Sequence, residues 1–251
     1  MKQNKVQILS QWIDNLSMHD ILRLIPVIID NRIPKAIFTP NVNFLVRAEK
    51  DDKFSKVLSE SDFLVPDGKP LIWASRFLGT PLKEKVSGSS LFFELCKLAV
   101  EHGYTIFLLG AAPGVARMAK HKLEANFKGL QISGTYSPPY GFENNPSEIE
   151  NINSILRNSK TDILVVGLGS PKQEYFIHEN KSKYQIPLSL GLGASIDFAA
   201  GIKVVPPNIL KNIGLAWLWR LIEEPRRLAG RYLVVDPSFF KLIWNQKLQK
   251  K

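Results

Sequence analysis

Cysteine and histidine are scarce in this sequence. One cysteine, Cys96, occurs in 251 residues, which excludes a disulfide scaffold and a cysteine-rich zinc site and favours a cytosolic protein. The four histidines are scattered without a His-x-x-x-His pair, and there is no Asp-x-Asp pair of the kind that often holds a divalent ion. We therefore expect neither a metal ion nor a cofactor.

Long hydrophobic runs and several well-known motifs are also missing. No stretch reaches the roughly 18 apolar residues that a membrane-spanning helix needs, so we expect none. The N-terminal residues show neither the apolar run nor the small-residue cleavage site of a secretory signal. The sequence lacks the GxGxxG fingerprint, the Walker A loop and the GxSxG elbow, which argues against a nicotinamide-dependent oxidoreductase, a P-loop nucleotidase and a serine hydrolase.

The composition is that of a folded protein, and the C-terminal part of the chain is basic. Hydrophobic residues make up 45% of the chain and charged residues 22%. Of the net charge of +10, residues 201–251 supply +7, from ten basic and three acidic side chains, and they hold three of the five tryptophans. We therefore place a boundary near residue 200, between an α/β domain over 1–200 and a basic, tryptophan-rich helical appendage over 201–251. The appendage either packs on its own domain or contacts an anionic surface, which would be membrane or nucleic acid.

Short apolar runs alternate with helix-length amphipathic stretches along the first 200 residues. The runs predict strands at 6–9, 36–39, 63–66, 105–110, 130–136, 162–169 and 187–193. The stretches predict helices at 42–60, 69–79, 89–102, 114–127, 146–159 and 172–184. Because apolar runs separated by helices are typical of buried parallel strands, we predict a doubly wound, mostly parallel, Rossmann-like α/β sheet with helices on both faces.

Turns that carry both glycine or proline and a polar group follow six of these strands. Ligands of open parallel sheets bind outside the carboxyl ends of the strands, so these turns predict a binding site. They are Thr39-Pro40-Asn41, Pro66-Asp67-Gly68, and residues 110–114, 134–141, 167–174 and 191–197. Tyr136, Gly191 and Gly193 are candidate substrate-binding residues on this basis.

Two of the turns are suited to phosphate. GAAPG at 110–114 and GLGSPK at 167–172 each open a predicted helix, so their backbone N–H groups and the positive helix end face outward. We take Gly110, Gly167 and Gly169 as candidate phosphate-binding residues, with Lys172 adding an ammonium group. The alternative is that the glycines only make tight turns.

Asp67 is the best candidate for acid or base chemistry, because a strand delivers it to the edge of the sheet beside apolar residues. The alternative is a helix cap or an Asx turn made by Asp67 and Gly68. Asp197 either accepts a hydrogen bond from a ribose hydroxyl or caps the next helix. Glu174 and His178 are four residues apart on a predicted helix, and we expect them to pair on its surface.

Several motifs occur together in one order. They are Thr39-Pro40-Asn41, Pro66-Asp67-Gly68, KVSGS at 85–89, GSPKQE at 169–174, GLAWLWRL at 214–221 and EPRR at 224–227. In these motifs, from about residue 35 to residue 235, the chain resembles the WecG/TagA/CpsF glycosyltransferases (glycosyltransferase family 26). Lys85 stands where the family usually has Arg, and Ala216 stands where it usually has Glu.

The resemblance implies a metal-independent, inverting transfer of a sugar from a UDP-sugar to a polyprenyl-diphosphate-linked acceptor at the inner face of the cell membrane. The sugar is N-acetylmannosamine in the teichoic-acid branch, and other hexoses in members that make capsule or exopolysaccharide. The resemblance also implies that Asp67 is the catalytic base and that Thr39, Asn41 and Gln173 are active-site polar groups. Lys85 is a candidate substrate-binding residue, and the basic appendage would be a membrane-touching lid.

Three arginines of the appendage are candidate substrate contacts. Arg220, Arg227 and Arg231 would share one face of a continuous helix and meet the membrane or the diphosphate, although Pro225 interrupts that helix or starts another. The alternative is i,i+4 pairing of these arginines with glutamates of the same helix.

Three other classes of protein compete with a glycosyltransferase. A Rossmann-like oxidoreductase lacks its fingerprint here. The basic appendage would allow nucleic-acid binding, although we expect no nucleic-acid partner. A non-catalytic subunit of a glycan-assembly complex is the third, and an activity assay separates it from an enzyme.

Overall fold

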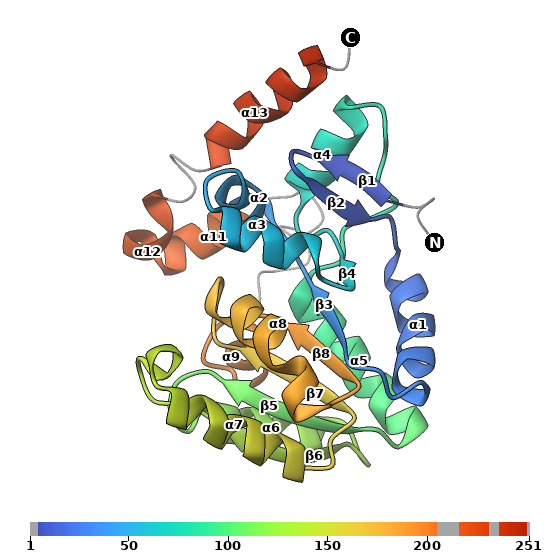
Figure 1. The fold of residues 1–251 in the computed structure, drawn as a ribbon, viewed down its shortest axis with the longest axis vertical. Helices are drawn as coiled ribbons and strands as arrows, with labels where there is room; N and C mark the ends of the chain where they lie inside the picture. The colour runs from blue at the N-terminus through green and yellow to red at the C-terminus, as the bar shows by residue number, and fades with distance from the viewer. Residues whose placement is uncertain (1–4, 205–215, 231–235, 250–251) are drawn as a thin grey trace.

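A six-stranded parallel sheet organises the protein, as seen in a computed structural model that describes residues 5–204, 216–230 and 236–249 (Figure 1). The strand order is β4-β3-β8-β7-β5-β6. The strands span Lys35–Phe38 (β3), Phe63–Leu64 (β4), Thr105–Gly110 (β5), Gln131–Tyr136 (β6), Ile163–Gly167 (β7) and Leu188–Gly191 (β8). Parallel neighbours need crossover connections, and the intervening helices provide them. The predicted doubly wound α/β sheet is confirmed.

Helices cover both faces of the sheet, because successive strand residues point to opposite sides. One face packs against α2 (Val42–Ala48), α3 (Asp52–Ser59), α7 (Pro146–Asn158) and α8 (Lys172–Tyr184). The other face packs against α1 (Met18–Asp30), α5 (Gly88–His102), α6 (Val115–Asn126) and α9 (Ser195–Ala199). Within β5, Phe107 and Leu109 belong to the first core, whereas Ile106 and Leu108 belong to the second. The sheet is therefore buried on both sides.

Two local predictions were wrong, and one helix was missed. The strand predicted at 6–9 is β1 (Lys5–Ile8), but it pairs antiparallel with β2 (Gln11–Asp14) in a separate hairpin and does not join the main sheet. The helix predicted over 42–60 is two helices, because Asp51 caps a new helix and its carboxylate accepts from Phe54 N at 3.0 Å. Helix α1, which contains Pro26, was not predicted.

The C-terminal helices begin with α11 (Ala216–Glu223) and α12 (Pro225–Gly230), followed by α13 (Asp236–Gln249). Phe239 and Ile243 of α13 are fully or almost fully buried in the same core as α2 and α4 (Lys69–Phe77). Gln246 of this helix accepts a hydrogen bond from Leu9 N at 2.9 Å. Helix α13 is thus packed against the hairpin end of the molecule (Figure 1).

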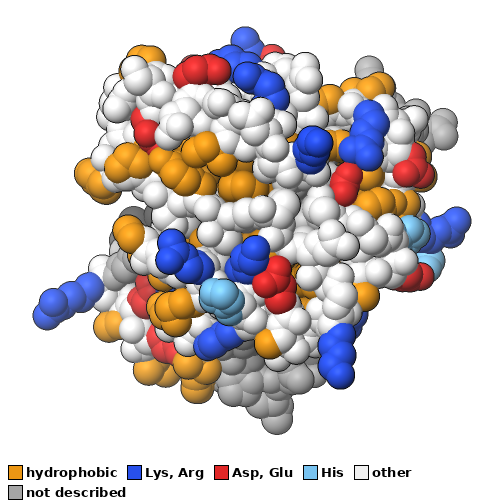
Figure 2. Space-filling view, turned by 90° about the horizontal axis from the view of Figure 1, so that it is seen from below, with side chains coloured by type: hydrophobic (Ala, Val, Ile, Leu, Met, Phe, Trp, Pro, Cys, Tyr) orange, Lys and Arg blue, Asp and Glu red, His pale blue; other side chains and the backbone are white. Residues whose placement is uncertain are grey.

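Surface charge on the described part is mixed in sign. Figure 2 shows the lower end of the molecule, where Lys and Arg side chains alternate with acidic and hydrophobic ones. Across the described residues, no helix combines the length and the hydropathy that crossing a bilayer would take.

Candidate active site

Backbone hydrogen bonds tie together the turns that follow β3 and β4. Val65 N donates to Phe38 O at 2.9 Å and Asp67 N donates to Pro40 O at 2.8 Å, so the Pro-Asp-Gly turn lies against the Thr-Pro-Asn turn. Val86 N donates to Pro66 O at 2.8 Å, which brings the segment of Lys85 to the same place. Three motifs that are up to 47 residues apart in the sequence therefore meet at the carboxyl ends of these strands.

Two glycines let the neighbouring elements approach this place. A Cβ atom on Gly88, at the start of α5, would lie 3.2 Å from Thr39 Oγ1 and 3.6 Å from the Leu192 side chain. A Cβ atom on Gly191 would lie 3.1 Å from Gln173 Nε2. Gln173 Oε1 accepts from Gly193 N at 3.0 Å, so α8 is fastened to the turn after β8. The GSPKQE run thus joins the same edge of the sheet.

The turns after β5 and β7 continue this edge. Ala111 N donates to Gly167 O at 3.0 Å. A Cβ atom on Gly110 would lie 2.6 Å from Gly167 C and O, and one on Gly167 would lie 2.9 Å from Gly193 O. Backbone therefore packs directly on backbone from β5 through β7 to β8, and only glycine fits at these two positions.

Four helices that start at this edge begin with a residue that has no polar side chain. The N-cap residues Gly68, Gly114, Pro171 and Ala194, of α4, α6, α8 and α9, make no side-chain cap hydrogen bond. Other helices have a polar side-chain cap, from Asn41 on α2, Ser87 on α5 and Asn145 on α7. Because an uncapped N-terminus offers N–H donors and partial positive charge, α6 and α8 can receive an anion at the carboxyl edge.

Glu174 is a fully buried carboxyl group beside this edge. Gln173 Nε2 donates to Glu174 Oε1 at 2.6 Å. Burial raises the pKa of Glu174 to about 7, and the hydrogen bond from Gln173 offsets part of that effect. Since Gln173 also binds Gly193 N, the Glu174 carboxyl fixes the orientation of the amide that connects α8 to the β8 turn.

The raised pKa predicts a pH-dependent stability. The folded protein retains the Glu174 proton up to about pH 7, whereas an ordinary glutamate loses it near 4.5, so the folded state binds more protons between these values. The free energy of unfolding should therefore fall as pH rises through this window, by roughly 3 kcal/mol from this group. Denaturant unfolding at both ends of the window should show a smaller fall in Glu174→Gln than in the parent protein, and parallel pH profiles would contradict the assignment.

Comparison with known proteins decides the family. The model of the glycosyl transferase WecG/TagA/CpsF family matches residues 6–251. The chain belongs to this family. It is a glycosyltransferase, as the resemblance in its motifs predicted.

Three relatives of this glycosyltransferase carry the name N-acetylglucosaminyldiphosphoundecaprenol N-acetyl-beta-D-mannosaminyltransferase. The protein of that name from Bacillus subtilis is 31% identical over 97% of this chain and 89% of its own length. The one from Bacillus spizizenii is 30% identical over 76% of this chain and 72% of its own length. The one from Staphylococcus aureus is 25% identical over 98% of this chain and 95% of its own length.

The four candidate catalytic residues of the glycosyltransferase lie at the carboxyl edge. Asp67 stands directly before Gly68, which is the N-cap residue of α4. Thr39 is almost fully buried beside Gly88. Asn41 caps α2, where its Oδ1 accepts from Asn43 N at 3.1 Å. Gln173 is also buried and braces the β8 turn, a positioning role that the sequence did not indicate.

Two candidate substrate-binding residues have protein partners. Lys172 is ion-paired with Glu143 and lies 5.2 Å from the Tyr140 ring centroid. The Tyr136 hydroxyl donates to Glu148 Oε1 at 2.6 Å, on α7. Contact of either residue with a substrate would require exchange of these partners. Lys85 is half-buried in the segment that Val86 anchors to the β4 turn.

Asp197 lies inside the first turn of α9, whose cap residue is Ala194, so the alternative of a helix cap at Asp197 was wrong. Its Oδ2 is 3.7 Å from Lys203 Nζ. The expected surface pair of Glu174 with His178 was wrong, because Glu174 is buried and His178 Nε2 instead lies 3.3 Å from Glu60 Oε2. The sequence alone does not show that the side of α8 that carries Glu174 faces the turn after β8.

The arginines of the appendage do not share one continuous helix. Pro225 begins α12, so Arg220 lies on α11 and Arg227 on α12, and their side chains are outside the described part. Arg231 lies wholly outside the described residues. Among the residues that are described, no cluster of three His, Cys, Asp or Glu side chains is placed to hold a metal ion.

Proposed function

We propose that this protein transfers N-acetylmannosamine, or a similar hexose, from a UDP-sugar to a polyprenyl-diphosphate-linked sugar acceptor, with inversion and without a metal ion. The relatives named above act on an N-acetylglucosaminyl-diphosphoundecaprenol acceptor, as their name states. One observation carries the proposal: the four family motifs of the α/β domain meet at one edge of the sheet, where backbone contacts connect β4 to β5.

Asp67 is the base in this mechanism. It takes the proton from the acceptor hydroxyl as that oxygen forms a bond to the anomeric carbon of the donor sugar. The bond between the anomeric carbon and the β-phosphate oxygen breaks at the same time, and the electron pair leaves with UDP. A single displacement of this kind inverts the anomeric configuration.

The leaving diphosphate needs compensation for its negative charge. The uncapped N-termini of α6 and α8 supply N–H donors on the β5 and β7 side of the edge. Lys172 stands at the first position of α8, and exchange of its Glu143 partner for a phosphate oxygen would add a cation. We assign the diphosphate to this side and the acceptor hydroxyl to the side of Asp67.

The acceptor lipid requires the protein to work at a membrane surface, and we propose that residues 201–251 hold it peripherally on the inner face. Ile222 of α11 is 71% exposed, and Leu218, one turn earlier, is 38% exposed. The basic residues of this part favour anionic lipid, each by about 1 kcal/mol.

A donor screen tests the proposal. UDP-hexoses would each be offered with a synthetic polyprenyl-diphosphate-GlcNAc acceptor, and released UDP would be measured. We expect UDP-N-acetylmannosamine to give the fastest release, with a rate that EDTA leaves unchanged, because the N–H groups and cations of the chain stabilise the leaving group. A reaction that stops with EDTA and returns with magnesium would overturn the metal-independent mechanism, and UDP release without acceptor would overturn the transfer.

A further inference from the structure

Helix α13 has a second apolar side that the core does not use. Phe239 and Ile243 are buried against the protein, but Phe240, Trp244 and Leu248, at i, i+4 and i+8, are 48%, 58% and 54% exposed. Residues at this spacing share one face of a helix. Packing in the core explains the apolar stripe of Phe239 and Ile243. It gives no role to the second stripe, Phe240, Trp244 and Leu248.

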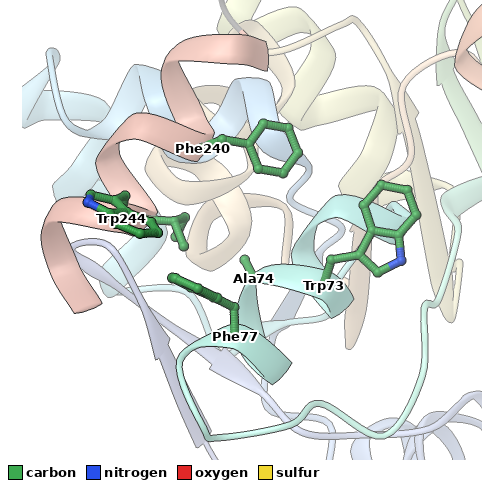
Figure 3. A pocket seen from close by; sticks show the side chains of 6 residues that line it. Trp73, Ala74, Phe77, Phe240 and Trp244 are labelled. Atoms are coloured by element: carbon green, nitrogen blue, oxygen red, sulfur yellow. The ribbon is translucent and has the colours of Figure 1, made fainter. Parts of the chain in front are cut away.

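A matching stripe lies on α4. Trp73 and Phe77, at i and i+4, are 47% and 44% exposed. The Phe77 and Trp244 rings stack, with their centroids 5.8 Å apart. The cleft between the two helices has a volume of about 270 Å³ and is lined by Trp73, Ala74, Phe77, Phe240, Ile243 and Trp244 (Figure 3). Exposed aromatic clusters of this kind are typical of surfaces that bind apolar groups.

The two helices that line this cleft carry mostly positive charge. Helices α4 and α13 carry four cations, Lys69, Arg76, Lys241 and Lys247, and a single acid, Asp236 at the start of α13. Lys247 Nζ lies 5.8 Å from the Phe77 ring centroid. Within the described part of the chain, the four cations make no ion pair. An apolar cleft beside the Lys247 ammonium, between two helices of net positive charge, is complementary to a hydrocarbon chain that ends in an anionic group.

The position of the cleft relative to Asp67 selects among such molecules. Helix α4 begins two residues after Asp67, and its nine residues rise by about 12 Å from Lys69 to Phe77. A sugar held at Asp67 and joined through a diphosphate to a hydrocarbon chain would place the chain at this distance. We propose that the cleft between α4 and α13 binds the isoprenoid units of the acceptor nearest its diphosphate, an inference that rests on the proposed function.

Paired substitutions test this inference. The double variant Trp73→Gln/Trp244→Gln removes one aromatic ring of the cleft from each helix. The control is Trp12→Gln, because Trp12 is 54% exposed on β2 and does not line the cleft. Binding of farnesyl diphosphate, which has no sugar to react, is measured by calorimetry without lipid or detergent. We expect the double variant to bind at least about tenfold more weakly than the parent protein, with the Trp12 variant unchanged.

A kinetic comparison then separates this inference from the proposed function. GlcNAc-diphosphate esters with a farnesyl chain or a methyl group are offered as monomeric acceptors. The double variant should raise KM for the farnesyl acceptor about tenfold, and leave kcat for the methyl acceptor and KM for the UDP-sugar unchanged.

Each result has a defined reading. Equal farnesyl diphosphate binding by the double variant and the parent protein overturns the cleft assignment, even if transfer is observed. Farnesyl diphosphate binding that depends on the two tryptophans, without turnover of either acceptor, retains the cleft and rejects the proposed transfer. If the double variant loses only its flotation with liposomes, the aromatic face binds the bilayer surface. If only its sedimentation changes, the face serves self-association. Either result overturns binding of the isoprenoid chain in the cleft.

Discussion

Asp67→Asn should reduce turnover by about 10²–10⁴-fold and leave the Kd for UDP unchanged. The amide cannot accept the proton of the acceptor hydroxyl, whereas the proposed diphosphate site is on the β5 and β7 side of the edge, with β3 and β8 between it and β4. UDP binding by calorimetry and UDP release with saturating substrates measure the two quantities separately.

Asp52→Asn is the matched control for this variant. It removes one carboxylate in the same way, but Asp52 is exposed on the first turn of α3. We expect its turnover to match that of the parent protein. Turnover near the parent level in Asp67→Asn would exclude Asp67 as the base, and equal loss in both variants would point to a general effect of charge.

Gly110→Ala should destabilise the protein severely. The new Cβ would lie 2.6 Å from backbone atoms of Gly167, which cannot rotate away as a side chain can, and the φ of +114° is strained for any L-residue. We expect a loss of about 4 kcal/mol in the free energy of unfolding, and a Tm lower by about 10 °C.

Gly114→Ala on the same turn separates the two causes. Its φ of +83° also disfavours alanine, but no atom lies within 4 Å of the added Cβ. We expect it to cost about 1–2 kcal/mol, which is the strain alone. Calorimetric melting of both variants measures the difference, and equal Tm values would show that the close contact between the β5 and β7 turns does not limit stability.

The sequence predicted the main sheet well because its four central strands, β3, β8, β7 and β5, are buried on both faces. A continuous apolar run such as TIFLLG at 105–110 has few other uses in a soluble fold, and β5 occupies that range without change. Strand β2 was not predicted, because QWID has only two apolar residues and gains its burial from the hairpin and α3. Short strands of this kind are specified by their partners more than by their own residues.

The residues of the candidate site that follow a strand could be predicted from the sequence. Residues whose role depends on being buried were harder to predict. Thr39 follows β3 directly and Asp67 comes three residues after the end of β4, so their place at the edge could be predicted from the sequence. Glu174 could not, because a polar residue on a polar helix is expected to face solvent. Only the fold shows that α8 places it next to Gly191 and against Gln173, where it loses its contact with water.

The hydrogen bond between Leu9 and Gln246 links positions 237 residues apart, which affects how the nascent chain folds. At a synthesis rate of 5–20 residues per second, the first hairpin waits roughly 12–50 s before the segment of α13 has been made. During that interval Phe239 and Ile243 are missing from the layer that they later complete. We therefore expect nascent chains on the ribosome to engage chaperones through this unfinished layer until translation has passed residue 246.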